Sequence, residues 1–252
     1  MSGDPFSLVG RRVAVTGANT GIGQGIALAV ARAGGAVVGI GRSAMDETAE
    51  QVAEVGGSFA SCVVDLSDVA SGVAALETVM EQAPLDGLVN NAGIIRRADS
   101  VDFTEADWDC VMDVNLKSVF FLSQAFARRR LAEGLPGQVV NIASLLSFQG
   151  GIRVPSYTAA KHGVAGITKI LANEWASRGI NVNAVAPGYI ETNNTEALRA
   201  DPDRSRAILE RIPAGRWGAP DDIGAAAVFL LAGASRYIHG AILPVDGGWL
   251  AR

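Results

Sequence analysis

The sequence predicts an α/β protein with a doubly wound parallel sheet, in which helices cover both faces of one sheet. The main observation is that β-branched, strand-like runs alternate with segments of helical spacing along the whole chain. Regular alternation is typical of a parallel sheet with crossover helices. Because these crossovers are right-handed, the helices fall on both faces. The second observation is a glycine-rich turn between the first strand and the first helix, which is a common site for a phosphate group.

The individual elements follow from the spacing of apolar residues and from turn signals. Strands are expected at residues 13–16, 36–40, 58–64, 87–90, 138–142, 180–185 and 241–245. The first helix should run from Ile22 to Ala33 and end at Gly34 and Gly35, since glycine commonly ends helices. Further helices are expected at about 44–55, 69–82 and 104–131, and after residues 156 and 220. Thr104, with Asp107 three residues on, has the pattern of a helix N-cap.

The chain should form a single domain over residues 1–252, because it contains no repeat, low-complexity tract or linker. Residues 188–219 are rich in glycine, proline, asparagine and charge, and form the one long stretch expected to be irregular. Loops of that length often serve as substrate lids. We therefore refer to residues 188–219 as the lid.

Composition excludes several classes of function. The net charge is −5 and no basic tract occurs, so nucleic-acid or anionic-membrane binding is not expected. Cys62 and Cys110 form no CxxC pair and are expected to be buried thiols, while His162 and His239 lie far apart. Neither a disulfide framework nor a metal site is predicted. The N-terminal stretch lacks the pattern of a signal peptide and the apolar runs are short, so a soluble cytoplasmic protein is expected.

The stretch from Ser144 to Lys161 holds the candidate catalytic residues. Tyr157 and Lys161 are four residues apart, so a helix places both on one face. A lysine cation at that distance would lower the tyrosine pKa from its usual value of about 10. Ser144 could add a hydroxyl across the intervening loop. Such pairs are common on helices, so the alternative is an ordinary helix surface.

Gly17, Gly21 and Gly23 lie in the first turn as T-G-x-x-x-G-x-G. Glycines there allow a tight turn and close backbone approach to a pyrophosphate at the amino end of the helix. In a doubly wound sheet, ligands collect at the carboxyl ends of the strands. The alternative is a turn with no ligand.

Several motifs together resemble the short-chain dehydrogenase/reductase family over essentially the whole chain. They are TGANTGIG (16–23), NNAG (90–93), Asn115, Ser144, YTAAK (157–161) and PG (187–188). The resemblance implies a Rossmann-type sheet of seven strands, a nicotinamide dinucleotide, hydride transfer and, usually, a homotetramer. It also implies that Tyr157 is the general acid/base, that Lys161 lowers its pKa and holds the nicotinamide ribose, and that Ser144 hydrogen-bonds the reacting oxygen. Asn115 would anchor a water relay to Lys161, unless it is simply a satisfied buried amide.

The resemblance also implies a set of cofactor contacts. These are Gly17, Asn19, Thr20, Gly21, Ile22, Gly23, Arg42, Asp65, Leu66, Asn91, Ala92, Gly93, Tyr157, Lys161, Pro187, Gly188, Ile190 and Thr192. Family members that prefer NAD commonly end the second strand with an acidic residue. Gly41 followed by Arg42 leaves room and charge for a 2′-phosphate, but the glycine turn has no second basic residue. NAD is slightly favoured, and NADP remains open.

Further stretches, including IIRRAD (94–99) and SFQGGIRVPSY (147–157), resemble family members that act on deoxy sugar acids. The expected reaction interconverts a keto and a hydroxy group of such a substrate. An arginine fork suits a carboxylate, so Arg153 and Arg97 are candidates, with Gln149 and Asn194 for sugar hydroxyls. The arginines could instead be exposed or brace the fold. Two functions remain as alternatives: another reductase of the family, acting on gluconate or a 3-oxoacyl carrier protein, and a non-catalytic dinucleotide-binding module.

Overall fold

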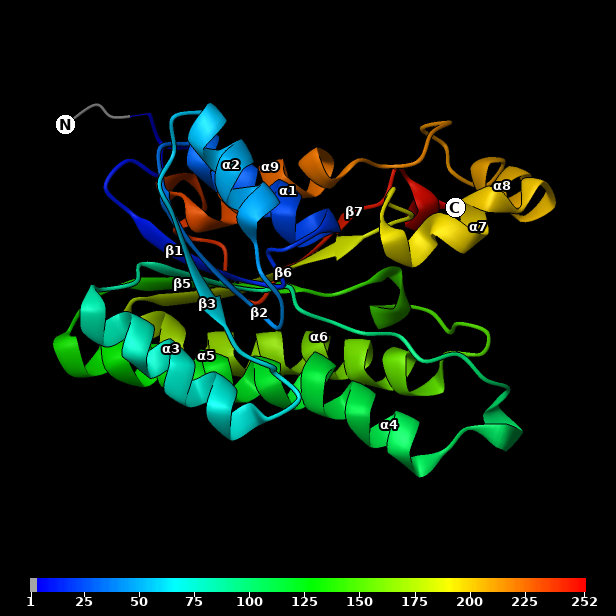
Figure 1. Cartoon of the computed structure of the whole chain (residues 1–252), viewed down its shortest axis with the longest axis horizontal. Helices are drawn as coiled ribbons and strands as arrows, with labels where there is room; N and C mark the ends of the chain where they lie inside the picture. The colour runs from blue at the N-terminus through cyan, green and yellow to red at the C-terminus, as the bar shows by residue number, and fades with distance from the viewer. Residues whose placement is uncertain (1–3) are drawn as a thin grey trace.

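A seven-stranded parallel sheet forms the centre of the molecule (Figure 1). The computed structural model describes residues 4–252. Residues 1–3, part of the N-terminal stretch in which no signal peptide is expected, lie outside the described residues. The strands are β1 (Arg12–Thr16), β2 (Ala36–Gly41), β3 (Phe59–Val63), β4 (Gly87–Asn90), β5 (Gly137–Ile142), β6 (Ile180–Pro187) and β7 (Ile242–Val245). Their order is β3-β2-β1-β4-β5-β6-β7. The predicted fold class is therefore confirmed.

Helices cover both faces of the sheet. They are α1 (Gly21–Arg32), α2 (Asp46–Glu54), α3 (Val69–Gln82), α4 (Glu105–Met112), α5 (Ser118–Glu133), α6 (Pro155–Trp175), α7 (Glu196–Ala200), α8 (Pro202–Leu209) and α9 (Pro220–Leu231). Figure 1 shows α1, α2 and α9 on one face and α3, α4, α5 and α6 on the other. The two short helices α7 and α8 lie to one side of this sandwich, close to the C-terminus.

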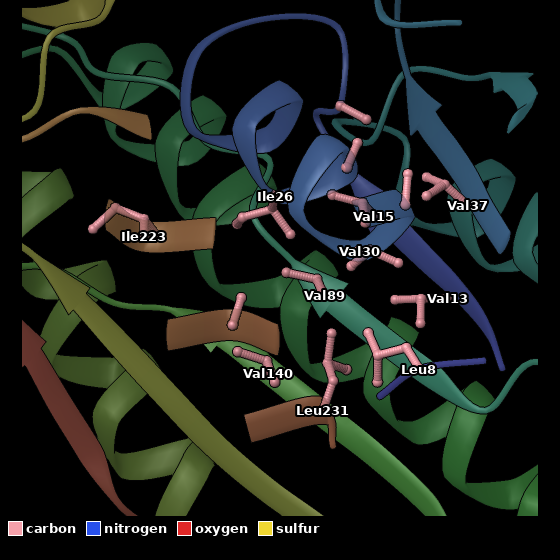
Figure 2. Close-up of a cluster of buried hydrophobic side chains, with 14 of the residues drawn as sticks. Leu8, Val13, Val15, Ile26, Val30, Val37, Val89, Val140, Ile223 and Leu231 are labelled. Atoms are coloured by element: carbon pink, nitrogen blue, oxygen red, sulfur yellow. The ribbon is translucent and has the colours of Figure 1, made fainter. Parts of the chain in front are cut away.

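The core lies on both faces of the sheet because successive strand residues point in opposite directions. Val13 and Val15 of β1 pack with Ile26 of α1 and Leu231 of α9 (Figure 2). The residue between them, Ala14, belongs to the cluster on the other face, with side chains of α3, α5 and α6. Burial on both faces explains why the strands appear in the sequence as continuous apolar runs.

The helix predicted over residues 104–131 is interrupted. Thr104 caps its start as expected, and its hydroxyl accepts a hydrogen bond from the Asp107 amide at 3.2 Å. Between α4 and α5, however, residues Asp113–Lys117 form a π-helical turn. Such turns insert an extra residue and often mark functional sites. Asn115 lies in this turn, so the interruption determines where its side chain points.

The prediction that the lid is irregular is wrong, because it contains a 3₁₀ turn (Asn193–Thr195) and helices α7 and α8. Asp201 caps α8 by accepting hydrogen bonds from the amides of Asp203 and Arg204, both at 3.1 Å. The base of the lid is closed by a parallel bridge between Ile190 and Gly218. The lid is therefore a largely helical segment whose two ends are joined beside the carboxyl end of β6.

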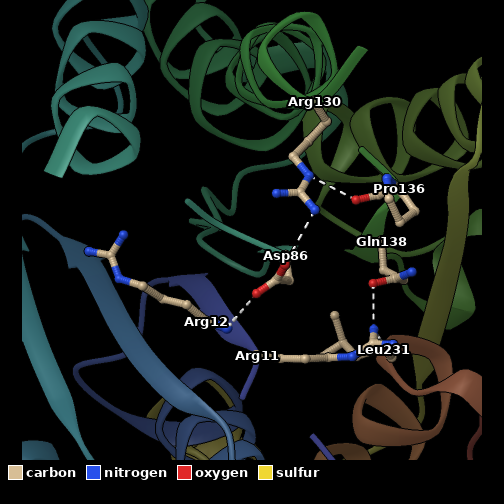
Figure 3. A network of polar contacts seen from close by, with 7 residues as sticks. All are labelled: Arg11, Arg12, Asp86, Arg130, Pro136, Gln138 and Leu231. Atoms are coloured by element: carbon tan, nitrogen blue, oxygen red, sulfur yellow. Dashed lines mark hydrogen bonds and ion pairs between the residues drawn. The ribbon is translucent and has the colours of Figure 1, made fainter. Parts of the chain in front are cut away.

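A polar network joins the amino ends of three neighbouring strands (Figure 3). Asp86 accepts hydrogen bonds from the Arg12 amide at 2.9 Å and from the Arg130 guanidinium at 3.2 Å. Arg11 donates to Gln138 at 2.7 Å and to the Leu231 carbonyl at 2.8 Å. The network therefore braces the amino ends of these strands, on the side of the sheet opposite to their carboxyl ends.

Within residues 4–252, no helix is both long enough and apolar enough to cross a membrane. The cytoplasmic location stays a prediction. Cys62 and Cys110 are free thiols, but each is only half-buried, in contrast to the burial expected from the apolar sequence around them. The reason in the case of Cys62 is that β3 is an edge strand with an open face.

Candidate active site

The candidate site lies at the carboxyl ends of four strands that are neighbours in the sheet: β1, β4, β5 and β6. The chain leaves these strands through Gly17, Asn91, Ala143 and Gly188, respectively. The glycine turn, the NNAG motif, Ser144 and the PG motif each lie at one of these strand ends, while Asn115 lies in the π-helical turn and the YTAAK motif on α6. The carboxyl ends of the strands form the edge of a doubly wound sheet at which ligands bind.

The glycine turn after β1 forms a cradle that side chains would fill. Gly17 and Gly21 have left-handed φ angles of +66° and +57°, a conformation that favours glycine. A Cβ added to Gly23 would lie 2.0 Å from the Gly17 carbonyl oxygen. Within residues 4–252, the side chain of Thr20 at the N-cap of α1 makes no capping hydrogen bond. The first amides of α1 are thus available to an anionic group, which fits a dinucleotide pyrophosphate.

Asn91 ties this turn to the end of β4. Its side-chain amide donates to the carbonyls of Thr16 at 2.9 Å and Gly17 at 3.3 Å. The Thr16 hydroxyl in turn accepts from the Asn91 and Ala92 amides, both at 2.9 Å. Thr16 was not among the predicted site residues, although a threonine at a strand end before a glycine turn is a usable signal. The two turns therefore form one rigid floor.

Asn115 is fully buried, and both polar atoms of its side-chain amide form hydrogen bonds to the main chain of one residue. Its Oδ1 accepts from the Ile94 amide at 2.8 Å, and its Nδ2 donates to the Ile94 carbonyl at 2.9 Å. Gly93 fits closely beside it, since an added Cβ would lie 3.4 Å from Asn115 Oδ1. The side chain is thus the satisfied buried amide of the alternative interpretation. The water relay to Lys161 stays a prediction.

Ser144, Tyr157 and Lys161 are brought together as expected. Pro155 is at the first turn of α6, where its fixed φ favours helix initiation, so Tyr157 and Lys161 lie in the first two turns. The Lys161 Nζ lies 5.5 Å from the Tyr157 ring centroid and donates to the Ile142 carbonyl at 2.6 Å. Ser144 caps the following 3₁₀ turn by accepting from the Leu146 amide at 3.1 Å.

The predicted lowering of the Tyr157 pKa is wrong in this structure. Burial raises the pKa of Tyr157, which outweighs the lowering by the Ser144 hydroxyl and by the charge of Arg97. Burial also lowers the pKa of Lys161 from 10.5 to about 8. Both directions have one cause, since a low-dielectric environment disfavours the charged form of each group. The lysine is held by a backbone carbonyl rather than by the phenol.

The two residues expected to choose the substrate on the loop before α6 are already engaged. Arg153 has a left-handed φ of +63°, and its side chain forms an ion pair with Asp99 at 3.1 Å. A non-glycine residue in that region is strained. Gln149 accepts a hydrogen bond from the Trp249 indole at 3.4 Å. Their contact with substrate stays a prediction.

Arg97 is better placed than Arg153 relative to the phenol. Its positive charge lowers the pKa of Tyr157, and its guanidinium donates to the Asn194 carbonyl at 3.3 Å. Arg97 thus lies between Tyr157 and the lid. Asn194 contributes here through its main chain. Arg216 forms a two-pronged pair with Asp222 at 2.8 and 2.9 Å, and therefore braces the lid base.

The end of β2 carries no carboxylate near the glycine turn. A Cβ added to Gly41 would lie 3.6 Å from Asn19 Oδ1, and Asn19 donates to the Ser43 hydroxyl at 3.0 Å. The amide of Ser67 lowers the pKa of Asp65, and the charge of Arg42 acts in the same direction. An exposed arginine and a hydroxyl thus stand where an acidic residue would bind a ribose.

The remaining predicted cofactor residues lie around this floor. Leu66, Pro187 and Ile190 are buried, whereas Ile22 and Gly188 are half-buried. Thr192, at the start of the lid, packs over the glycine turn: a Cβ added to Gly21 would lie 3.3 Å from its methyl group. The lid thus begins directly above the predicted pyrophosphate site.

Comparison with known proteins gives matches over the whole chain. A family model described as enoyl-(acyl carrier protein) reductase matches residues 17–250. A 2-dehydro-3-deoxy-D-gluconate 5-dehydrogenase from Dickeya dadantii is 56% identical over 248 residues, 98% of each chain. A solved structure from Agrobacterium tumefaciens, described as a 2-deoxy-D-gluconate 3-dehydrogenase with bound NADP, is 66% identical with a TM-score of 0.95, covering 99% of this chain and 100% of that one.

A further solved structure is a gluconate 5-dehydrogenase from Burkholderia cenocepacia in complex with NADP and tartrate. It is 38% identical, has a TM-score of 0.93 and covers 99% of this chain and 98% of that one. These matches span both chains nearly end to end, and they agree with the glycine cradle and the Ser144–Tyr157–Lys161 set described above. The chain therefore belongs to the short-chain dehydrogenase/reductase family of NAD(P)-dependent oxidoreductases.

Proposed function

We propose that the protein transfers a hydride between NAD(P)(H) and a keto or hydroxy group of a deoxy sugar acid. The specific reaction would be that of a 2-dehydro-3-deoxy-D-gluconate 5-dehydrogenase, also called 2-deoxy-D-gluconate 3-dehydrogenase. The observation that carries this proposal is the 56% identity over 98% of the chain to the Dickeya dadantii enzyme of that name. The positive charge of Arg97, between Tyr157 and the lid, supports an anionic substrate.

In this proposal the proton chemistry belongs to Tyr157. A bound nicotinamide would supply or accept the hydride. During reduction the Tyr157 hydroxyl gives its proton to the substrate carbonyl oxygen, and during oxidation the phenolate removes it from the alcohol. The Ser144 hydroxyl donates a hydrogen bond to the same oxygen. Because burial raises the pKa of Tyr157, the phenol stays protonated near neutral pH, which suits its role as the acid in reduction.

Lys161 and Asn115 support this step. The Lys161 ammonium is 5.5 Å from the phenol ring centroid, so it stabilises the phenolate when the proton leaves. Asn115 holds the turn after β4 through its two bonds to Ile94. The sugar-acid carboxylate is assigned to Arg97, whose planar fork matches a carboxylate. Arg153, Gln149 and Asn194 would line the same pocket.

For the cofactor, we propose that the protein uses both dinucleotides and binds NADP(H) more tightly. The slight preference for NAD expected from the sequence depended on the absence of a second basic residue in the glycine turn and on the resemblance to family members that act on deoxy sugar acids. Arg42, together with the Asn19–Ser43 hydrogen bond beside Gly41, offers charge and polar atoms to a 2′-phosphate. The two solved relatives described above carry NADP.

The test is a panel of keto sugar acids assayed with NADH and with NADPH. We expect turnover of the 2,5-diketo-3-deoxy acid by the wild-type protein and a loss of about 10³-fold in kcat for Tyr157→Phe. Circular dichroism and nucleotide binding should show that the variant is folded and still binds cofactor. If the wild type binds cofactor but reduces no ketone, the protein is the non-catalytic module of the alternative interpretation.

Adding gluconate and a 3-oxoacyl carrier protein to the panel separates the other reductases of the family. Preference for gluconate would place the chain with the gluconate 5-dehydrogenases. Preference for a 3-oxoacyl carrier protein would contradict the sugar-acid proposal. That outcome is not expected, because a net charge of −5 does not suit an acidic carrier protein.

We further propose a homotetramer, as the family resemblance implies. Two large apolar side chains on consecutive helices support association of copies: Trp108 of α4 is 40% exposed and Phe121 of α5 is 37% exposed. An assembly that covers these two side chains would remove their apolar surface from water, which is favourable.

A further inference from the structure

The C-terminal turn, Trp249–Ala251, lies between the lid and the loop that follows β5. We call that loop, residues 143–154, the Ser144 loop. Trp249 is only 4% exposed and forms an apolar cluster with Leu145 and Ile212. Leu145 directly follows Ser144, and Ile212 belongs to the lid. Trp249 therefore contacts both the Ser144 loop and the lid, which lie on either side of the candidate site.

Different parts of the Trp249 indole contact the Ser144 loop and the lid. The Trp249 Nε1 donates to Gln149 of the Ser144 loop at 3.4 Å. The guanidinium of Arg211, in the lid, lies 3.9 Å from the indole ring centroid, within the range of a cation–π interaction. The polar edge of the ring thus contacts the Ser144 loop, and its face contacts the lid. A side chain that only filled space would require neither contact.

The turn that presents Trp249 is held firmly. Asp246 accepts hydrogen bonds from the Gly248 amide at 2.8 Å and from the Leu250 amide at 2.9 Å. Gly247 and Gly248 have left-handed φ angles of +64° and +89°. A Cβ added to Gly247 would lie 2.8 Å from Ile212 Cγ2. The position of the indole is therefore fixed relative to the base of the lid.

The middle of the lid is exposed. From residue 191 to residue 211 no side chain is buried, and burial resumes at Ile212, beside Trp249. Segments with few buried apolar contacts open most easily. The contacts of Trp249 are therefore a main constraint on how far the lid lies from the Ser144 loop.

We propose that Trp249 is a positioning residue that holds the lid and the Ser144 loop at the separation required to bind substrate. It acts through Arg211 and Ile212 on one side and through Leu145 and Gln149 on the other. The proposal rests on the proposed function only for the choice of assay substrate. Small displacements of positioning groups have large kinetic effects, because the substrate must be held within narrow limits.

The test uses Trp249→Leu, with Tyr237→Leu as the control, because Tyr237 is an aromatic side chain that is 96% exposed. The first measurement is the rate of tryptic cleavage in the lid, at Arg199, Arg204 and Arg206, which needs no substrate. We expect Trp249→Leu to raise both that rate and the KM for substrate by about tenfold. The KM for cofactor should change less, because Trp249 contacts the lid at Arg211 and Ile212, whereas the glycine turn is covered by Thr192 at the other end of the lid. The control should match the wild type in all three.

A second variant keeps the test decisive if Trp249→Leu does not fold. Trp249→Phe keeps an aromatic face for Arg211 but loses the donor to Gln149. It should leave the lid protected and still raise the KM for substrate. In addition, the effects of Arg211→Met and Gln149→Leu on KM should be non-additive in the presence of Trp249 and additive in its absence.

Three results would overturn the proposal. One is wild-type lid cleavage and wild-type KM in Trp249→Leu. Another is a raised KM with an unchanged cleavage rate in Trp249→Leu, which would make Trp249 a direct substrate contact. The third is additivity of Arg211→Met and Gln149→Leu in the wild-type background. If no sugar acid is turned over at all, the cleavage rate alone tests the role of Trp249. Failure of the proposed function can therefore be distinguished from failure of this proposal.

Discussion

At the scale of single residues, the charge of Arg97 should be visible in the pH dependence of oxidation. Oxidation needs the phenolate of Tyr157, so its rate rises with pH through the pKa of that group. Arg97 lowers this pKa. Arg97→Leu should therefore shift the rising limb to higher pH, while Arg97→Lys should restore it. Arg153→Leu is the matched control, since Arg153 pairs with Asp99 at the surface. Equal shifts in both leucine variants would contradict the assignment.

Lys161 should reduce stability near neutral pH. Its pKa is lowered from 10.5 to about 8 in the folded protein, which disfavours the charged folded form by about 3 kcal/mol. The unfolded chain binds the proton more tightly, so stability rises as the pH passes from about 8 to 10.5. Lys161→Met should abolish activity yet raise the free energy of unfolding by about 1–2 kcal/mol at pH 7, after loss of the bond to Ile142.

This gain should disappear by about pH 10, where the wild-type lysine is becoming neutral in both states. Urea denaturation at the two pH values measures it. Lys169→Met, an exposed lysine on the same helix, is the control and should show no such pH dependence. A destabilised Lys161→Met at pH 7 would show that the hydrogen bond to Ile142 outweighs the burial penalty.

Tyr157 and Lys161 also show which features of the site could be predicted from the sequence. The spacing of Tyr157 and Lys161 was enough to place both on one face of α6, because helical periodicity is local. The direction of the Tyr157 pKa was not accessible, because it depends on burial by distant segments. The role of Trp249 was missed for the same reason: its partner Gln149 is 100 residues away in the chain.

At the scale of helices and strands, seven strands and the helices between them were predictable because each carries its own apolar pattern. The π turn at Asp113–Lys117 was not, since it shifts the spacing within one continuous helical pattern. Helices α7 and α8 were missed because they are only 5 and 8 residues long and bury no side chain. The Asp201–Pro202 start of α8 was nevertheless a usable signal.

The polar network at the amino ends of the strands should affect stability and not catalysis. Arg130 is 4% exposed, so Asp86→Ala leaves a buried cation without its carboxylate. We expect a loss of about 2–3 kcal/mol in the free energy of unfolding and an unchanged kcat per folded molecule. The control Asp221→Ala, which breaks the exposed pair with Arg32, should cost less than about 1 kcal/mol. Chemical denaturation compares the two variants, and equal losses would contradict the role given to Asp86.

At the scale of the whole molecule, the exposed aromatic side chains of α4 and α5 lead to a prediction about assembly. Light scattering after size-exclusion chromatography should give the mass of four chains of 26.0 kDa. A buried positive charge in an apolar interface is costly, so Phe121→Arg should give smaller species while leaving the monomer fold intact by circular dichroism. Val63→Arg on the exposed edge strand β3 is the matched control and should remain tetrameric. A wild-type monomer, or a tetrameric Phe121→Arg, would show that this helical face is not where copies meet.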